Sequence, residues 1–588
     1  MGRLLGDLLS FRKQGRSHPA TVPAAQQQTE HGLSLPTVPL SDPRKAPDVA
    51  ILLCKDLAKL GSGLDLKTLR SSLEASLAGT TVEILTDLCG DLGQVPSVVS
   101  RLGVSRIVLG VCSGDYSEIE VQSRAKKAGM DPFAIEVVPL GTWCAMVHAR
   151  PEATTKARRL LAGAVAKVNS LQESGPENTR LYFRPKDNKV TRRTLFTVPP
   201  VGVRPVPAIV WGRCVAASGC HLCVTACPNQ SLHKVSGVVS LDKARCESCG
   251  ICLAACPKDA LDFPAWALPQ VEAQLAALLE PSLSTSEPTG ILLCCKGAVH
   301  ELEALARRGL KYSDHWLPVV LPCLGMVTAG GILQVLASGA SGVSFLSCDP
   351  ACALGQADTV SGRVDFCQKL LSQVGEIPER ASLAGASFNL EDLWRFLQQP
   401  LESSSGLKTP EGSLHLANPE DTFRALQDIA RADGPAGDII LEHAHSPFGV
   451  LELEAGLCTG CKACAEACPT GALKLQDSSN GKEFAFRPRI CTGCGTCVSA
   501  CPEKSAQILR VRTKTDLNVL SSETIIIPLN AMVRCESCGD PFASQALVRR
   551  IEELLREQYG EHGTELSRFC PSCRMSLPSM SMSCASGH

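Results

Sequence analysis

The sequence has almost no excess charge of either sign: 58 Lys and Arg residues stand against 59 Asp and Glu residues, for a formal net charge of −1. Proteins that bind nucleic acid or an anionic membrane surface usually display a basic patch that attracts the phosphates. The composition therefore argues against both classes of partner. The 588 residues are enough for about four domains.

Long apolar runs are also scarce. The one charge-free stretch that is long enough to cross a bilayer lies between Pro318 and Cys348. Glycines, serines and Gln334 interrupt it, and the pattern predicts a helix near Thr328–Ser338 followed by a strand near Val343–Ser347. We therefore expect a buried βαβ segment and no membrane span.

A cleavable leader is not recognisable in the first residues. Residues 1–11 are interrupted by Asp7 and lead into polar sequence without a small-residue cleavage site. Residues 1–47 are rich in Pro, Gln, Ser and Thr and show no sustained period, so we expect a disordered tail. A cysteine-rich chain without a leader is expected to be cytoplasmic, where thiols stay reduced.

Fingerprints of common cofactors and catalytic groups are missing too. There is no Ser/His/Asp constellation, no phosphate loop and no G-x-G-x-x-G segment of the kind that opens a dinucleotide-binding fold. We therefore expect no flavin and no independent substrate site. Cysteine, in contrast, is abundant, with 31 residues.

Sixteen of the 31 cysteines fall into four tight runs, each ending in Cys-Pro. Three runs have the spacing C-x2-C-x2-C-x3-C-P, and the first run has five residues in its opening gap. This is the pattern of two-cluster bacterial ferredoxins, in which three cysteines bind one cubane cluster and the fourth binds its neighbour. Zinc knuckles and disulfides are the alternatives. The pattern indicates iron–sulfur clusters and hence electron transfer.

The crossing rule assigns these cysteines to four [4Fe–4S] clusters. The first ferredoxin module, residues 208–263, would hold one cluster with Cys214, Cys220, Cys223 and Cys256 and another with Cys246, Cys249, Cys252 and Cys227. The second module, residues 447–510, would use Cys458, Cys461, Cys464 and Cys501 for one cluster and Cys491, Cys494, Cys497 and Cys468 for the other. Proline after each fourth cysteine fixes the direction in which the chain leaves the loop.

Residues 48–170 alternate short apolar runs with helix-like stretches, a pattern typical of a parallel α/β sheet. A cysteine follows each of four predicted strands: Cys54, Cys89, Cys112 and Cys144. The carboxyl ends of parallel strands line one crevice, so we expect the four thiols to converge on a further cluster. Four free buried cysteines are the alternative.

Residues 289–375 repeat this arrangement. Apolar strands end at Cys294 and Cys295, at Cys323 and at Cys348, and Cys352 follows shortly afterwards. We again expect thiols to gather at the strand ends. Structural cysteines without a cluster are the alternative.

The last domain, residues 530–577, contains two C-x2-C pairs formed by Cys535, Cys538, Cys570 and Cys573. Between the pairs, one helical stripe can cover a small core; it consists of Leu547, Val548, Ile551, Leu554 and Leu555. Four thiolates make a closed tetrahedral site, which suits structural zinc, with a rubredoxin-type iron as the alternative. We expect a zinc-ribbon-like knuckle.

Two of these segments resemble known families. The phrases VLGVCSGDYSEIE, KKAGMDPFAIEVV and GTWCAMVHARPEATTKARRLL, all within residues 48–170, resemble the amino-terminal domain of the A-type iron–sulfur subunit of heterodisulfide reductase. In that family, cysteines at such positions hold a [4Fe–4S] cluster. The family continues into an FAD-binding domain, whose glycine-rich fingerprint this sequence lacks.

Residues 289–375 resemble the methyl-viologen-reducing hydrogenase delta subunit, whose comparable cysteines hold a [2Fe–2S] cluster. The resemblance implies Cys295, Cys323, Cys348 and Cys352 as ligands, with Cys295 preferred over Cys294. The sequence departs from the family at Ala298, where a cysteine is replaced, and in the shortened gap between Cys348 and Cys352.

The sequence thus predicts a multidomain α/β and α+β protein with two parallel-sheet cluster domains, two bacterial ferredoxin-like modules and a zinc-ribbon-like knuckle. The expected function is that of an electron-transfer subunit that relays electrons through several clusters. Its expected partners are other redox subunits, of flavoprotein, hydrogenase or reductase type, or a soluble ferredoxin. Two alternatives remain open. One is a self-sufficient disulfide or sulfur reductase that uses a strand-end cluster, and the other is a scaffold that clusters merely stabilise.

Overall fold

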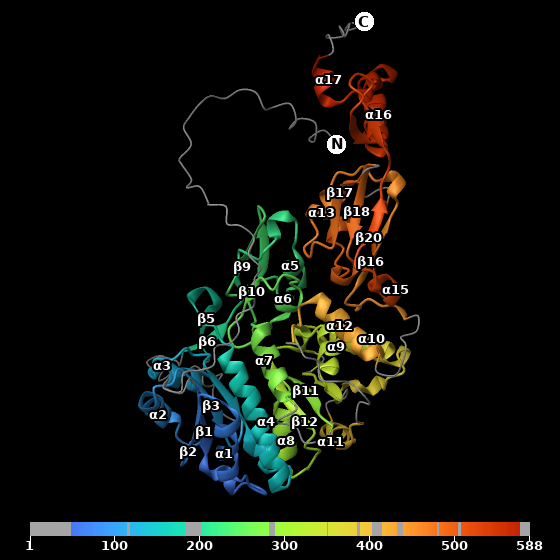
Figure 1. Cartoon of the computed structure of the whole chain (residues 1–588). Helices are drawn as coiled ribbons and strands as arrows, with labels where there is room; N and C mark the ends of the chain where they lie inside the picture. Colours follow the sequence, from blue (N-terminus) through green and yellow to red (C-terminus); the bar gives the residue numbers. More distant parts are fainter. Residues whose placement is uncertain are drawn as a thin grey trace, which may run out of the picture. The chain divides into compact units, whose positions relative to one another are not determined.

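The computed structural model of the chain describes the residues from Val49 onward, with gaps. The described ranges are 49–114, 118–172, 175–183, 201–280, 288–349, 351–384, 389–402, 414–431, 439–478, 481–503 and 507–576. The predicted disordered tail, residues 1–47, lies outside these ranges. The order of the elements along the chain is drawn in Figure 1.

The first α/β domain is a four-stranded parallel sheet with the strand order β2-β1-β3-β4. Its strands are β1 (Val49–Cys54), β2 (Thr80–Leu85), β3 (Arg106–Gly110) and β4 (Ile135–Val138). Its helices are α1 (Leu66–Ser76), α2 (Val95–Leu102), α3 (Glu118–Lys127) and α4 (Arg150–Asn169), with short helical turns η1 (Lys55–Ala58), η2 (Leu92–Gln94) and η3 (Gly141–Ala145). Every residue of β1 is buried, as expected for a central strand that is covered by helices on both faces.

The second α/β domain has the corresponding strand order, β12-β11-β13-β14, and is also parallel throughout. Its strands are β11 (Gly290–Cys295), β12 (Trp316–Leu321), β13 (Gly342–Leu346) and β14 (Ala381–Leu383). Its helices are α8 (His300–Arg307), α9 (Ala329–Ala337), α10 (Ala357–Gln373), α11 (Leu390–Gln398) and α12 (Pro419–Arg431), with turns η7 (Leu324–Met326) and η8 (Pro378–Arg380). The fourth strand lies beyond the predicted boundary at residue 375, so the sheet extends further along the chain than the sequence indicated.

The charge-free stretch forms the helix and strand that its glycine pattern predicts. Helix α9 begins after Thr328, whose hydroxyl oxygen accepts a hydrogen bond from the Gly331 amide at 3.0 Å, and the buried strand β13 follows it. A hydroxyl acceptor at this position satisfies one of the free amides of the first helical turn. Among the described residues no helix is both long enough and apolar enough to cross a membrane.

The two α/β domains share a continuous apolar core. Helix α4 packs against α7 (Leu268–Leu278), which precedes the second sheet in the chain (Figure 1). Across this contact the buried Arg159 guanidinium donates hydrogen bonds to the Leu278 carbonyl oxygen at 2.8 Å and to the Thr289 hydroxyl at 2.9 Å. The two sheets are therefore joined by packed helices and buried hydrogen bonds.

The segment predicted as a polar linker, residues 170–207, is in part an antiparallel pair. Strands β5 (Thr179–Phe183) and β6 (Val201–Pro205) form it, after the turn η4 (Pro176–Asn178). The Gln122 side chain exchanges two hydrogen bonds of 2.8 Å with the backbone of Val203, which fastens β6 to helix α3. These strands are too short to leave a periodic signal in the sequence, so the pair was not predicted.

The first ferredoxin module consists of two small antiparallel pairs. Its elements are β7 (Ala208–Ile209), η5 (Ala216–Ser218), α5 (Leu222–Ala226), β8 (Leu232–Val235), β9 (Val238–Leu241), α6 (Ile251–Ala254) and β10 (Leu261–Asp262). Strand β7 pairs with β10, and β8 pairs with β9. The cysteine loops lie between these elements.

The second ferredoxin module has two three-stranded sheets, with the strand orders β15-β19-β16 and β17-β18-β20. Its strands are β15 (Ile440–Glu442), β16 (Gly449–Leu453), β17 (Leu473–Ser478), β18 (Gly481–Phe486), β19 (Leu509–Asp516) and β20 (Ile525–Pro528). Its helical elements are η9 (Ala455–Leu457), α13 (Ala463–Glu466), η10 (Pro488–Ile490), α14 (Thr496–Ala500) and α15 (Leu517–Ser521). Because β20 pairs with β18, the module continues past its predicted end at residue 510.

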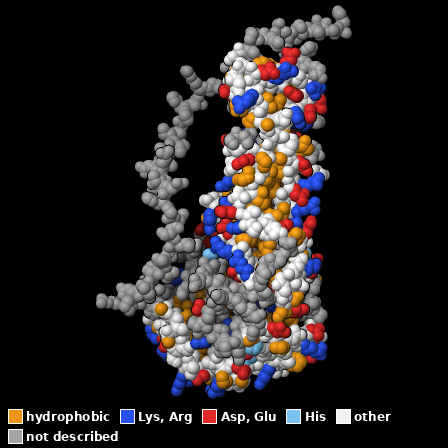
Figure 2. Space-filling view, turned by 45° about the vertical axis from the view of Figure 1, so that its right-hand side comes forward, with side chains coloured by type: hydrophobic (Ala, Val, Ile, Leu, Met, Phe, Trp, Pro, Cys, Tyr) orange, Lys and Arg blue, Asp and Glu red, His pale blue; other side chains and the backbone are white. Residues whose placement is uncertain are grey.

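The last domain contains the hairpin β21 (Met532–Arg534) and β22 (Pro541–Ser544), then α16 (Gln545–Tyr559), η12 (Glu561–Arg568) and α17 (Pro571–Ser576). The predicted apolar stripe of α16 is only partly right. Val548 is buried, whereas Leu554 is exposed. Figure 2 shows basic and acidic side chains interspersed over the visible face, in keeping with the balanced composition.

Candidate functional site: the cysteine centres

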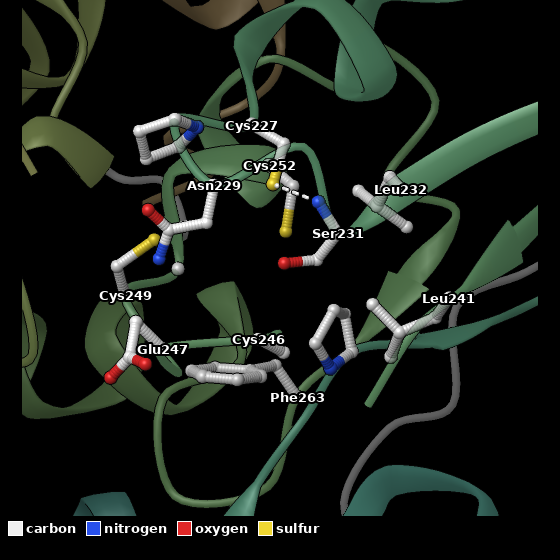
Figure 3. A pocket seen from close by; sticks show the side chains of 13 residues that line it. Cys227, Asn229, Ser231, Leu232, Leu241, Cys246, Glu247, Cys249, Cys252 and Phe263 are labelled. Atoms are coloured by element: carbon white, nitrogen blue, oxygen red, sulfur yellow. Dashed lines mark hydrogen bonds between the residues drawn. The ribbon is translucent and has the colours of Figure 1, made fainter. Parts of the chain in front are cut away.

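The first ferredoxin module brings together the sulfurs that the crossing rule assigns to one cluster. Cys227, Cys246, Cys249 and Cys252 line one cavity, together with Ser231 and Phe263. In Figure 3 the sulfurs of Cys227, Cys249 and Cys252 point toward this space, and the Phe263 ring lies along its edge. An all-thiol set around a partly closed, apolar cavity is the environment that an iron–sulfur cubane requires.

The local backbone explains how three nearby cysteines reach one space. Ser248 and Gly250 both have positive φ, 56° and 75°, which turns the chain sharply on either side of Cys249. Gly250 is also approached closely by the Met326 sulfur, 3.3 Å from where a Cβ atom would lie. A left-handed turn at a close approach favours glycine, so this loop is fixed both by conformation and by packing.

The other set of the first module is likewise together. Burial raises the pKa of Cys223 to about 12, and the neighbouring thiolates of Cys256, Cys220 and Cys214 act in the same direction. Thiols that repel each other's negative charge in this way need a cation between them to be deprotonated together. Iron supplies that cation, so the electrostatics fit a metal cluster and do not favour four free thiolates.

The second module repeats both sets. Cys458, Cys461, Cys464 and Cys501 line one cavity. For the other set, burial raises the pKa of Cys491 to about 12, with further contributions from the Cys497, Cys468 and Cys494 thiolates. In all four sets, the cysteine before proline lies with three cysteines of the neighbouring run.

Backbone amides donate to two of the sulfurs. The Ser231 amide donates to the Cys227 sulfur at 3.2 Å, which is the dashed line in Figure 3, and the Ala260 amide donates to the Cys256 sulfur at 3.4 Å. Both donors stand four residues after the cysteine of a Cys-Pro pair. Hydrogen bonds to cluster sulfurs help to set the reduction potential. Sequence reasoning missed these donors, although the internal repeat of the module contains the signal.

The two ferredoxin modules meet at one cysteine set of each. Burial raises the pKa of Cys220, and the charge of Cys494 in the other module contributes to the shift. A Cβ atom at Gly219 would be 3.6 Å from the Cβ of Ala467, which precedes Cys468. The loops that carry the two facing sets are therefore in van der Waals contact.

In the second α/β domain, Cys295, Cys323, Cys348 and Cys352 line one cavity at the strand ends. Cys294 is buried on the other side of β11, where its thiol donates to the Leu292 carbonyl oxygen at 3.5 Å. Cys323 is near enough to Cys249 for its charge to add to the burial that raises the pKa of Cys249 to about 12. The strand-end site thus borders the first ferredoxin module.

In the first α/β domain the structure brings together three of the four predicted cysteines. The sulfurs of Cys54, Cys89 and Cys112 all lie within 4.8 Å of one another. Cys144 is completely buried in the turn η3 and is not part of this group. The expectation of four converging strand-end thiols therefore does not describe the arrangement here.

The four cysteines of the last domain also form a compact group. The sulfurs of Cys535, Cys538, Cys570 and Cys573 lie within 4.8 Å of one another. The Cys570 amide donates to the Cys535 sulfur at 3.3 Å, and the Cys573 amide donates to the Cys570 sulfur at 3.4 Å. Four sulfurs in one small volume suit a single tetrahedral ion.

Three segments match protein-family models. Residues 239–262 match the model described as a 4Fe-4S binding domain, and residues 457–505 match the 4Fe-4S dicluster domain. Residues 291–398 match the model of the methyl-viologen-reducing hydrogenase, delta subunit. The chain therefore contains 4Fe–4S ferredoxin domains and a hydrogenase delta subunit-like domain.

Curated relatives are similar over a smaller part of their length, and both described here are A-type subunits of a heterodisulfide reductase. The chain is 26% identical over 132 residues to the iron-sulfur subunit of the CoB-CoM heterodisulfide reductase of Methanocaldococcus jannaschii, a match that spans 22% of this chain and 20% of that protein. It is 30% identical over 119 residues to the corresponding subunit of the ferredoxin/F(420)H(2)-dependent CoB-CoM heterodisulfide reductase of Methanosarcina acetivorans, spanning 20% of this chain and 15% of that protein. The matches thus cover about a fifth or less of these relatives.

Proposed function

We propose that the chain is the electron-transfer subunit of an oxidoreductase complex and that its centres form one row. The row starts at the strand-end site of the second α/β domain, passes through both sets of the first ferredoxin module and ends at the second module. The ferredoxin cysteines hold four [4Fe–4S] clusters, and Cys295, Cys323, Cys348 and Cys352 hold a [2Fe–2S] cluster. Such clusters supply one-electron redox chemistry over a wide range of potentials.

The continuity of the sulfurs from one site to the next carries this proposal. Cys323 interacts with Cys249, Cys223 with Cys252, Cys220 with Cys494, and Cys497 with Cys464. Each pair joins two neighbouring centres, so every centre of the row has its next neighbour close by. A scaffold stabilised by metal would not need its clusters in line.

The protein around the row performs two tasks. It holds each sulfur in place through loop turns and amide donors such as the one from Ser231 to Cys227. It also packs domain against domain at the crossings, as Ile251 does, whose Cγ1 atom is 3.1 Å from the Cβ position of Gly325. Fixed distances between centres favour transfer along a defined order.

The last domain closes one end of the row. The Ser544 hydroxyl donates to the Thr459 carbonyl oxygen at 2.8 Å, and Arg550 pairs with Glu503 at 3.5 Å, which places the domain beside the Cys458 and Cys501 loops. We propose that Cys535, Cys538, Cys570 and Cys573 bind structural zinc there. The partners are redox subunits that dock near either end of the row.

Magnetic coupling between reduced clusters tests the row. In fully reduced protein, neighbouring paramagnetic clusters should broaden each other's EPR spectra. Cys494→Ala should remove about four irons and should sharpen the signals of the clusters on both sides of the gap. Cys89→Ala is the matched control, because it removes a thiol outside the row and should leave the broadening unchanged. A wild-type spectrum equal to the sum of isolated clusters would contradict the proposal.

A further inference from the structure

The first α/β domain has a three-thiol centre whose geometry differs from that of every other cysteine set in the described chain. Cys54 ends strand β1, Cys112 follows β3, and Cys89 follows β2. The Cys112 amide donates to the Cys89 sulfur at 3.1 Å, so two of the loops are tied to each other. The three sulfurs form a triangle at the edge of the sheet.

Cys144, the fourth strand-end cysteine, is held away from this triangle. A Cβ atom at Gly141, three residues before it, would lie 2.0 Å from the Cys112 carbonyl oxygen, so the turn η3 touches the Cys112 loop through backbone. The Cys144 side chain instead lies near Lys156 and Tyr312, which it influences electrostatically. Both residues are buried, and Cys294 of the second domain lies beside the same lysine.

The second α/β domain shows where a fourth thiol can come from. Both sheets have the same order, so Cys54, Cys89 and Cys112 correspond in position to Cys295, Cys323 and Cys348. The second domain takes its fourth cavity-lining cysteine, Cys352, from the loop that carries Cys348, four residues later. The sequence position four residues after Cys112 is Tyr116, so the first domain lacks a thiol there.

We propose that Cys54, Cys89 and Cys112 hold a [4Fe–4S] cluster by three thiolates and that a small exogenous thiolate completes the fourth iron. This inference rests on the iron–sulfur function proposed above and extends it to a ligand-binding centre outside the row. Ligand binding is a substitution: a thiol loses its proton and displaces a bound water, so one Fe–O bond breaks and one Fe–S bond forms. No electron is transferred in this step.

The cavity beside the triangle determines the class of ligand. It measures about 120 Å³, and its apolar lining consists of Leu92, Leu109, Val111, Val121 and Val137, together with Cys89, Cys112 and Ser113. No lysine or arginine is among these described lining residues, so the cavity offers no cation to a phosphate or carboxylate. A thiolate suits both the soft metal and the apolar wall. Cys89 is exposed, which gives a ligand access from solvent.

Asp56 is a charged side chain beside the triangle. Its Oδ2 atom lies 3.9 Å from the Cys54 sulfur, but Asp56 is not part of the group whose ligand atoms are mutually within 4.8 Å. We therefore assign it no bond to iron. Asp56→Asn should leave the iron content and the spectrum of the centre unchanged.

Substitution of single cysteines in the full chain tests the ligand set. After anaerobic reconstitution, Cys89→Ala should lose about four irons and four sulfides, whereas Cys144→Ala should retain them. Cys294→Ala is the matched control for Cys144→Ala, because both thiols are buried beside Lys156. Loss of four irons in Cys144→Ala but not in Cys294→Ala would show a four-cysteine site and overturn the inference. Zinc without sulfide at the Cys89-dependent site would overturn it as well.

The open iron position has a spectroscopic signature that needs no variant with a buried change. Ferricyanide should remove one electron from [4Fe–4S]²⁺, and the resulting [4Fe–4S]³⁺ should release its uncapped iron as Fe²⁺ to leave [3Fe–4S]⁺. The EPR signal of that product should be present in wild-type protein and absent from Cys89→Ala. If both proteins gave the same signal, the centre would have no uncapped iron.

Ligand binding is measured with 2-mercaptoethanol as the probe and acetate as the control. The thiol should shift the EPR spectrum of the reduced, Cys89-dependent cluster in a saturable manner, and acetate should not. An equal response to both compounds, or no response to the thiol, would contradict the thiolate assignment. None of these results alters the coupling expected among the ferredoxin clusters, so the row of centres and the three-thiol centre can fail separately.

Discussion

The two α/β domains are stabilised by a continuous apolar core, whereas each ferredoxin module has only a small core of its own. In the modules, cysteines such as Cys252 and Cys464 are themselves part of the apolar packing. Domains this small bury too little apolar surface to be stable without help from metal or disulfides. The comparison indicates that apolar burial holds the α/β part and that clusters hold the modules.

Removing the metal should separate these two kinds of stability and give the largest effect. Because metal-binding free energy becomes folding free energy, chelation under mild oxidation should unfold residues 208–263 and 447–510. Strands β1 and β11 should remain folded. Hydrogen exchange followed by mass spectrometry would report the loss of protection by segment. Equal loss of protection in the modules and in β1 would show that the α/β core depends on metal too.

A single crossed ligand should disturb one cluster and leave its neighbour largely intact. Cys227→Ala should remove or alter the cluster of Cys246, Cys249 and Cys252, with a loss of up to about four irons. The cluster that Cys256 completes should survive. EPR and iron counting distinguish the two clusters, and selective loss of the Cys256 cluster would contradict the crossing.

A cavity in the α/β core should cost less than a cluster but more than a surface change. Leu333 on α9 is fully buried, and Leu333→Ala should lower the free energy of unfolding by about 2–5 kcal/mol. Leu554→Ala, at a leucine that is 48% exposed, should change it by less than about 0.5 kcal/mol. Urea denaturation monitored by circular dichroism measures both. Similar values for the two variants would indicate that the core is loosely packed.

The smallest effect concerns the pH dependence of the α/β part. Burial raises the pKa of Glu272 from 4.5 to about 7, opposed by the hydrogen bond that its carboxylate accepts from the Leu416 amide at 2.6 Å. The folded state then binds more protons than the unfolded state between these values, so stability falls as the pH rises through this window. Glu272→Gln should flatten this dependence, as measured by urea midpoints at about pH 5 and about pH 8. An unchanged slope would remove Glu272 as its source.

The local parts of these sites followed from the sequence, and the long-range parts did not. The spacing of the cysteine runs predicted that Cys223 would meet Cys256, because a short loop has few ways to place its sulfurs around a cubane. The place of Cys144 depends on the turn η3 and on the second domain, which packs against that turn through α8. Neither leaves a periodic signal in the sequence.

Element boundaries show the same division. The charge-free stretch predicted α9 and β13 nearly to the residue, because glycines and a threonine cap mark the helix ends. Strand β14 has only three residues and was missed, since its existence depends on pairing with β13. Short strands that gain stability only from a neighbour cannot be recognised from their own residues.

The position of Cys220 beside Cys494 has a kinetic consequence. Two separate ferredoxins exchange electrons only when they collide, so their rate depends on concentration. Here a single polypeptide holds both modules, and the exchange becomes a first-order event whose effective concentration is fixed by the chain, of the order of millimolar or above for tethered partners. Dilution should therefore leave internal transfer unchanged, and only the exchange with external donors and acceptors should slow.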